Sequence, residues 1–244
     1  MRDKRIQLFL LPFAGGNSSS FHHLMEFLDE GIEVICVEYA GRLSRRKEGY
    51  IGEYEAFLKD AADYINARRR EELPFSILGY SLGSVLAFDL IVNRMLKGKP
   101  GHCFLCARGD LKNAGASQGY QELPEEEFVQ KMIALGGFDE RILENKRFLD
   151  IYMKPVRMDY QIWSQYRYVE QGHKIPCDTT VMYSPEDPLS SDARAWESLV
   201  MGKTDFYEFG GNHFFINRHY KEMAEIINHH LKIKSGNRKD GMEL

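Results

Sequence analysis

The chain has 244 residues, of which 43% are hydrophobic and 28% charged, so it carries enough apolar material for a sizeable core and does not have the composition of a disordered chain. This length favours a single α/β domain over residues 1–244, with an insertion. The formal net charge of −4 argues against a general nucleic-acid binder, because such proteins carry a basic surface.

Six short apolar runs are candidate strands, and longer helical patterns lie between them. The strands are expected at Ile6–Leu11, Val34–Glu38, Phe75–Leu78, Cys103–Cys106, Thr179–Tyr183 and Phe206–Phe209. The helices are expected at Gly52–Arg70, Leu82–Leu96, Asp192–Val200 and Asn217–Leu231. Short continuous apolar runs are typical of strands that are covered on both faces. The alternation therefore predicts a mostly parallel sheet flanked by helices.

The stretch from residue 118 to about residue 172 breaks this alternation, because it holds no convincing strand and is rich in aromatic residues. Helices are expected there at Pro124–Leu135, Arg141–Leu149 and Ile151–Tyr168, with breaks at Gly136-Gly137 and Lys154-Pro155. A helical block inserted between two strands is either a lid over a site or additional core, and the pattern alone leaves both open.

The chain shows no pattern of a membrane or metal protein. No apolar run reaches the roughly 18 residues of a membrane-spanning helix, and Ile6–Phe13 is predicted as a first strand rather than a signal peptide. The four cysteines are Cys36, Cys103, Cys106 and Cys177. Three of them lie in strand-like runs, which indicates reduced thiols in the cytoplasm. Cys103 and Cys106 have CxxC spacing, but no second pair completes a zinc site.

Gly79-Tyr80-Ser81-Leu82-Gly83 matches the GxSxG pattern and lies between a predicted strand and a predicted helix. That context is typical of a nucleophile elbow, in which the flanking glycines allow a sharp turn and the serine projects from the edge of the sheet. The start of the following helix offers N–H groups and partial positive charge. The alternative is a plain strand-to-helix turn in which Ser81 is only an N-cap.

A serine nucleophile needs a base and an acid that orients the base, and both candidates lie downstream. Asp187 follows the predicted strand Thr179–Tyr183, and His213 follows Phe206–Phe209 in a glycine-rich loop. Both lie past the carboxyl end of a strand, at the same sheet edge as Ser81, and the chain order Ser, Asp, His is that of α/β-hydrolases. Glu186 is the alternative acid, and Asp187 is favoured over it.

Leu11-Pro-Phe-Ala14-Gly-Gly16 ends the first predicted strand in a glycine-rich loop. Such a loop can direct backbone N–H groups at a developing oxyanion, and the N–H of Leu82, the residue after the nucleophile, is the second expected donor. A phosphate-binding loop is the alternative, but the GxxxxGK[ST] and GxGxxG spacings are both absent.

Along nearly its whole length the chain resembles the type II thioesterases that accompany nonribosomal peptide and polyketide synthases. The matching segments are the opening loop Leu11–Gly16, Glu38–Arg42, the elbow Gly79–Gly83, the lid signature Leu123–Phe128 with Leu135–Gly137, the lid end Asp159-Tyr160 with Tyr166–Tyr168, Asp187–Leu189 with Trp196, and His213–Phe215. The lid signature and the opening loop are much more specific to this family than GxSxG.

The resemblance implies an α/β-hydrolase fold with a lid, and a serine thioesterase mechanism. It assigns Ser81 as nucleophile, His213 as base and Asp187 as orienting acid, with the backbone N–H groups of Ala14 and Leu82 as the oxyanion hole. The substrate is then an acyl, aminoacyl or peptidyl thioester on the phosphopantetheine arm of a carrier protein, and the enzyme clears wrong or stalled groups. The resemblance implies no metal and no cofactor of its own, and we expect a monomer that contacts neither nucleic acid nor membrane.

The chain departs from the family pattern at two loops. The family usually has Gly before the catalytic His, where this chain has Asn212, and Asn tolerates left-handed backbone angles better than most residues. The segment after Cys103–Cys106 reads Ala-Arg108-Gly-Asp110, where the family usually has two arginines and a proline.

Two other functions remain open from the sequence. The same triad serves a carboxylesterase or an acyltransferase, and a hydrolase fold can also act as a binding module without catalysis. Basic residues of the insertion are candidate contacts for an acidic carrier protein. They are Lys131, Lys146, Arg147, Lys154, Arg157 and Arg167.

Overall fold

A computed structural model gives the fold and describes residues 4–112, 119–137, 146–170, 172–190 and 192–231. Six strands form one parallel sheet in the order β2-β1-β3-β4-β5-β6. They are β1 (Ile6–Leu11), β2 (Ile32–Cys36), β3 (Phe75–Tyr80), β4 (His102–Cys106), β5 (Asp178–Tyr183) and β6 (Thr204–Glu208). All six expected strands are present, with ends shifted by at most two residues, and the predicted mostly parallel sheet is confirmed.

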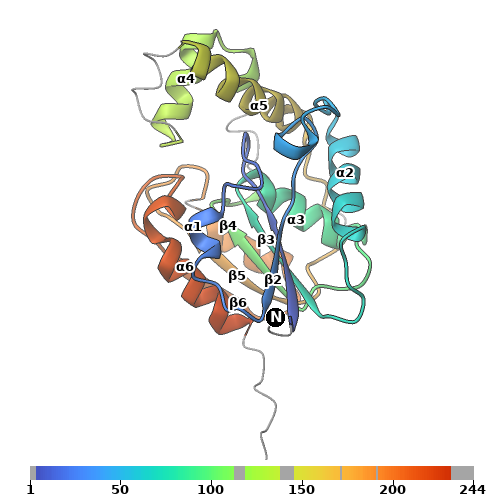
Figure 1. The fold of residues 1–244 in the computed structure, drawn as a ribbon. Helices are drawn as coiled ribbons and strands as arrows, with labels where there is room; N and C mark the ends of the chain where they lie inside the picture. Colours follow the sequence, from blue (N-terminus) through green and yellow to red (C-terminus); the bar gives the residue numbers. More distant parts are fainter. Residues whose placement is uncertain (1–3, 113–118, 138–145, 171, 191, 232–244) are drawn as a thin grey trace, which may run out of the picture.

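Helices cover both faces of this sheet (Figure 1). They are α1 (His22–Met25), α2 (Tyr54–Asn66), α3 (Leu82–Val92) and α6 (Ile216–His230), with 3₁₀ turns at η1 (Leu43–Arg45) and η5 (Ala193–Leu199). One hydrophobic cluster joins the sheet to α2 and α3, and another joins it to α1 and α6. Full coverage explains why β1 and β3 are buried along their whole length. The helix expected over 192–200 is a 3₁₀ turn.

The chain between β4 and β5 forms a cap over the end of the sheet opposite the N-terminus, which is the carboxyl end of the strands (Figure 1). Its described elements are η3 (Tyr120–Glu122), α4 (Glu125–Ala134) and α5 (Lys146–Gln165). The α5 helix packs against η3 and α2. Part of the expected helix Arg141–Leu149, and the expected limits of the insertion at residues 118 and 172, fall on or beside residues outside the described part.

The predicted break at Lys154-Pro155 is wrong, because α5 continues through Pro155. A proline inside a helix costs about 3 kcal/mol, since it removes one hydrogen bond and crowds the preceding turn. The carbonyl that loses its hydrogen-bond partner belongs to Ile151, a residue on the solvent side of the helix that is 61% exposed. On the buried side, Val156, Tyr160 and Trp163 pack into the core and offset the cost.

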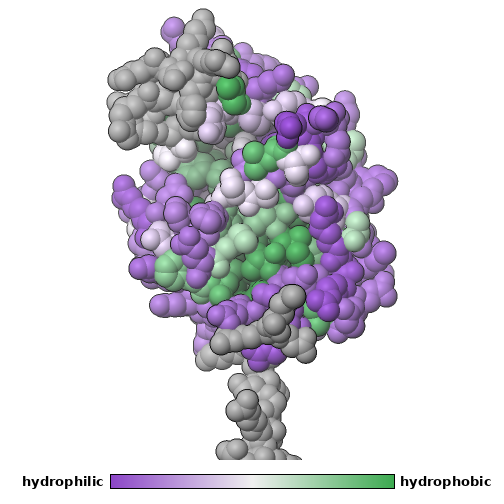
Figure 2. All heavy atoms as spheres, in the orientation of Figure 1, coloured by the Kyte–Doolittle hydropathy of each residue, from purple (hydrophilic) through white to green (hydrophobic). Residues whose placement is uncertain are grey.

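The β2 strand is one edge of the sheet and is only half-buried beyond its first residue. In Figure 2 hydrophobic residues accordingly come to the surface over this part of the molecule. Within the described ranges, no helix is long and apolar enough to cross a membrane.

Candidate active site

Ser81 lies at the tip of the turn between β3 and α3, with a backbone φ of 55°. Here the positive φ belongs to the serine itself, and the two flanking glycines serve a different purpose from the sharp turn that the sequence suggested. A Cβ on Gly79 would overlap the backbone of Gly83, and a Cβ on Gly83 would overlap the carbonyl of Leu11. The glycines therefore let the elbow pack directly on the end of β1, which holds the strained serine in place.

The three residues expected to form a triad are brought together by three strand ends. His213 Nε2 lies 2.9 Å from Ser81 Oγ, and His213 Nδ1 lies 2.8 Å from Asp187 Oδ2. All three residues are buried. The Tyr80 hydroxyl donates to the His213 carbonyl at 2.7 Å, which anchors the histidine loop to β3. This geometry suits a serine nucleophile, a general base and an orienting carboxylate.

Asp187 is completely buried, and its surroundings favour the carboxylate form. Burial alone would raise its pKa, but hydrogen bonds from His213, the Ser190 hydroxyl (2.7 Å) and the Leu189 N–H (2.9 Å) outweigh burial and lower it. The alternative acid, Glu186, accepts instead from the Gly211 N–H at 3.0 Å. Its carboxylate supports the turn that carries His213, whereas Asp187 holds the imidazole.

The histidine loop explains why Asn212 fits where the family usually has Gly. Among the described residues the left-handed angle in this loop belongs to Gly211, with φ of 103°, so the loop does not depend on the tolerance of Asn212 for such an angle. The Asn212 side chain instead accepts from the Phe214 N–H at 3.1 Å, and the backbone carbonyl of Asn212 accepts from the Phe215 N–H. These bonds close the turn directly around His213.

Ala14 and Leu82, the expected oxyanion donors, both border the space in front of Ser81. Leu82 is the first residue of α3, where an N–H has no partner within the helix. Within the described part of the chain the Ala14 N–H makes no hydrogen bond either. The next N–H, of Gly15, donates to Asp159 Oδ2 at 2.7 Å, and this bond fixes the loop.

Asp159 also pairs with Arg42, and this buried ion pair joins the cap to the opening loop. Asp159 and Arg42 are 1% and 4% exposed. Both residues lay in segments that carried the family resemblance, but their role as mutual partners was not predicted. The two residues are 117 positions apart, and no local pattern in the sequence connects them.

Two hollows meet at Ser81. The larger, of about 200 Å³, lies under the cap and is bordered by Phe13, Met132, Tyr152 and His213 among others. The smaller, of about 20 Å³, lies beside Ala14 and Leu82 and is bordered by Arg108, Tyr160, Trp163 and Leu189. A lining by residues of α4 and α5 supports the interpretation of the insertion as a cover, since both hollows need the cap as a wall.

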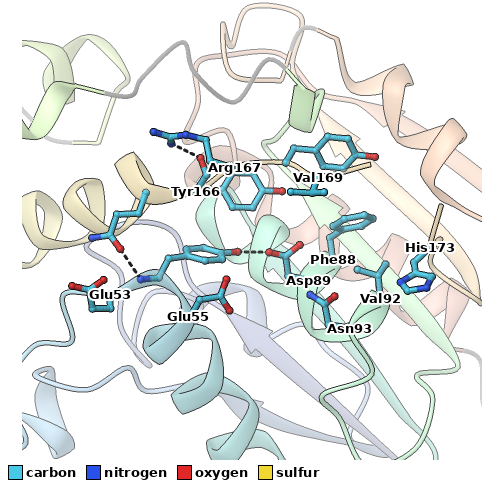
Figure 3. Close-up of a pocket in the computed structure, with 13 residues that line it drawn as sticks. Glu53, Glu55, Phe88, Asp89, Val92, Asn93, Tyr166, Arg167, Val169 and His173 are labelled. Atoms are coloured by element: carbon cyan, nitrogen blue, oxygen red, sulfur yellow. Dashed lines mark hydrogen bonds between the residues drawn. The ribbon is translucent and has the colours of Figure 1, made fainter. Parts of the chain in front are cut away.

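A separate hollow of about 370 Å³ lies between α2, α3 and the end of α5 (Figure 3). Figure 3 shows Glu53, Glu55 and Asp89 along it, and the Tyr54 hydroxyl donates to Asp89 Oδ2 at 2.6 Å. Neither Ser81 nor His213 lines this hollow, so it is not part of the candidate active site.

The structure also shows the surroundings of the cysteines and of the candidate docking residues. Cys103 and Cys106 are buried free thiols, and Cys36 and Cys177 are partly buried free thiols. Among the described residues, no group of three or more His, Cys, Asp or Glu is placed to hold a metal ion. The candidate docking residues Lys131, Lys154 and Arg167 are exposed.

Arg157 differs from these exposed cations. It donates to the carbonyls of Gln121 and Leu123, so its guanidinium holds η3 to α5. The side chains of Lys146 and Arg147 lie outside the described part.

A family model for the thioesterase domain matches residues 6–231. The chain belongs to the thioesterase family. The gramicidin S biosynthesis protein GrsT of Aneurinibacillus migulanus is 26% identical to it over 233 residues, which cover 94% of this chain and 90% of GrsT. The predicted family resemblance and the activity as a thioester hydrolase are thereby confirmed.

Solved structures of thioesterases share this architecture. The type II thioesterase BorB from the borrelidin biosynthetic cluster matches with a TM-score of 0.81 and 26% identity, over 95% of this chain and 96% of BorB. ClbQ from the colibactin NRPS/PKS pathway has the same fold, with a TM-score of 0.84 and 22% identity over 93% of this chain and 96% of ClbQ. The α/β-hydrolase fold expected for this thioesterase is confirmed.

Proposed function

We propose that this thioesterase is a type II enzyme that removes acyl, aminoacyl or peptidyl groups from the phosphopantetheine arms of carrier proteins and so proofreads a nonribosomal peptide or polyketide assembly line. The observation that carries the proposal is the hydrogen-bonded row Ser81–His213–Asp187 beneath a helical cap, in a chain of this family. The names of the relatives, a gramicidin S biosynthesis protein and a borrelidin-cluster type II thioesterase, support the assembly-line setting.

The proposed reaction has two halves that use the same residues. His213 Nε2 takes the proton of Ser81, whose oxygen attacks the thioester carbonyl. The N–H groups of Ala14 and Leu82 stabilise the oxyanion, the carbon–sulfur bond breaks, and His213 returns the proton to the leaving thiolate. A water molecule then gives its proton to His213 and attacks the acyl-enzyme, which releases the acid and restores Ser81. Asp187 keeps the imidazole oriented and stabilises its protonated form.

The cap supports delivery by a carrier protein. Lys131 on α4 and Lys154 on α5 are exposed, and beside Lys154 stand Ile151 and Tyr152, which are 61% and 44% exposed. Tyr152 also borders the larger hollow, so this surface adjoins a way in to Ser81. An acidic carrier protein that docks on basic and apolar side chains here could pass its arm into that hollow.

The test compares one acyl group on two leaving groups, a carrier protein and N-acetylcysteamine. Lys131→Glu and Lys154→Glu are expected to raise KM for the carrier-bound substrate about tenfold, because a glutamate there would repel an acidic carrier, and to leave the small thioester unaffected. Lys99→Glu is the matched control, because Lys99 is also exposed but precedes β4 at the opposite end of the sheet.

Three outcomes would count against the proposal. Equal losses on both substrates would mean that the two lysines act through the fold or the triad, and their docking role would fail. No preference for the carrier-bound substrate would remove the carrier from the function. Faster turnover of the corresponding oxygen ester, or transfer to an added amine or alcohol, would favour a carboxylesterase or an acyltransferase.

A further inference from the structure

Arg108 is a buried cation beside the nucleophile that the reaction described above does not use. It lies in the loop after β4, is 6% exposed, and borders the small hollow with Ser81, Ala14 and Leu82. Its carbonyl accepts from the Trp196 indole at 2.7 Å, which fixes the backbone. The position of the side chain is therefore set by the fold rather than by solvent.

The Arg108 guanidinium has no anionic partner among the described residues. It makes no hydrogen bond or ion pair there, and its buried Nε is unsatisfied. Its charge centre lies 4.3 Å from the centre of the Trp163 ring. The two carboxylates that act on its charge are engaged elsewhere, since Asp187 holds His213 and Asp192 accepts from the Asp110 N–H. Burial lowers the pKa of Arg108, as expected for a cation that is removed from water.

A second buried arginine, Arg42, shows which kind of partner Arg108 lacks. Arg42 is equally buried but faces the carboxylate of Asp159. Buried arginines are normally paired with carboxylates or phosphates, because an unpaired buried charge is costly. A buried polar group without a partner calls for an explanation, and functional sites are where charged groups with strongly perturbed pKa values cluster. The surroundings of Arg108 thus lack an acceptor, and the hollow in front of it is where one would sit.

The chemistry of the triad indicates which part of the substrate enters that hollow. The leaving sulfur must lie near His213 Nε2, which protonates it, and His213 borders the larger hollow. The arm of the substrate therefore occupies the larger hollow. The smaller hollow contains Ala14 and Leu82 but not His213, and it is left for the acyl group. Its volume of about 20 Å³ is only slightly more than one water molecule needs, so it has room for no more than the end of a short chain.

We propose that Arg108 determines acyl specificity, and that the preferred substrates are short acyl groups with an oxygen acceptor at the end, above all a carboxylate. This inference rests on the proposed function for the identity of the thioester, but not on the carrier. A carboxylate would neutralise the guanidinium through a charge-assisted hydrogen bond. An α-ammonium group of an aminoacyl substrate would be repelled, so such substrates are expected to react more slowly than uncharged ones of equal size.

The test uses three N-acetylcysteamine thioesters of nearly equal size: malonyl, 3-oxobutanoyl and butyryl. Wild type is expected to show a higher kcat/KM for malonyl than for butyryl, with 3-oxobutanoyl between them. In Arg108→Met the malonyl-to-butyryl ratio should fall by about tenfold to a hundredfold, the usual worth of a hydrogen bond to a charged group. Arg108→Lys keeps the charge without the planar fork and should retain part of the preference.

Several results would overturn the inference. One is a wild-type preference for butyryl over malonyl. Another is an equal loss of kcat/KM on all three thioesters in Arg108→Met, provided that this protein still melts like wild type and still reacts with a fluorophosphonate at Ser81. If Arg108→Met does not fold, the wild-type ratios and Arg108→Lys still decide the matter. A loss on 3-oxobutanoyl as large as that on malonyl would mean that hydrogen bonding, rather than charge, gives the preference.

The outcome is separable from that of the proposed function. The same three acyl groups on a carrier protein test delivery, whereas the ratios on N-acetylcysteamine test Arg108. Absence of any advantage for the carrier would refute the proposed function and leave the specificity result standing.

Discussion

The buried pair Arg42–Asp159 offers a quantitative test of how the cap is held to the active-site loop. Asp159→Asn keeps the shape of the side chain and an oxygen for the Gly15 N–H, but removes the charge that faces Arg42. Breaking a buried ion pair by neutralising one partner costs about 3–5 kcal/mol. Arg42 has no second acceptor, since its Nε and Nη1 are already unsatisfied, so we expect an Asp159→Asn cost within that range.

The reverse change, Arg42→Met, should cost less. An arginine cannot lose its proton at accessible pH, whereas an aspartate left without its partner can bind one. Burial already raises the pKa of Asp159, so protonation is an available way to reduce the penalty. The double variant should lose less stability than the two single losses combined, by at least about 1 kcal/mol, as contacting residues generally do.

Urea unfolding at pH 8 measures these free energies, with the slope of the unfolding free energy against urea concentration as a check that the transition remains two-state. Asp63→Asn is the matched control, because Asp63 pairs with Lys59 on the exposed side of α2 and such pairs contribute at most about 1 kcal/mol. The reasoning fails if Asp159→Asn costs no more than Asp63→Asn, or if the two single losses simply add.

Two further expectations follow from other carboxylates. Asp187→Asn should lower kcat by about 10³- to 10⁴-fold at an unchanged melting temperature, whereas the kcat of Glu186→Gln should stay within a few-fold of wild type. Steady-state kinetics that give the reverse order would refute the choice of acid. Burial raises the pKa of Asp89 to about 6, so the folded protein keeps this proton to higher pH than the unfolded chain. The contribution of Asp89 to the free energy of unfolding should therefore fall by about 2–3 kcal/mol as pH rises from 4 to 6.5, and Asp89→Asn should remove this contribution. If the unfolding free energies of wild type and Asp89→Asn, measured in urea, followed parallel curves against pH, the expectation would be wrong.

Much of the site could be predicted because each of its residues has a recognisable pattern in its own stretch of sequence. A glycine-flanked serine between a strand and a helix, and an acid and a histidine after two later strands, become neighbours in any parallel sheet whose strands end at one edge. The order of the strands in the sheet was not needed for this. The apolar runs that form β1 and β3 were equally clear, because both faces of these strands are covered.

The tertiary structure decided what depends on contacts between distant segments. It selects Asp187 over the adjacent Glu186 by the direction each carboxylate takes, and it pairs Arg42 with Asp159 across 117 residues. It also carries α5 through Pro155, since burial of one helix face outweighs a local cost that sequence patterns read as a break. Arg108 is the extreme case: its sequence neighbours do not show that it is buried without a counter-charge, because that depends on which carboxylates the fold places near it and which it engages elsewhere.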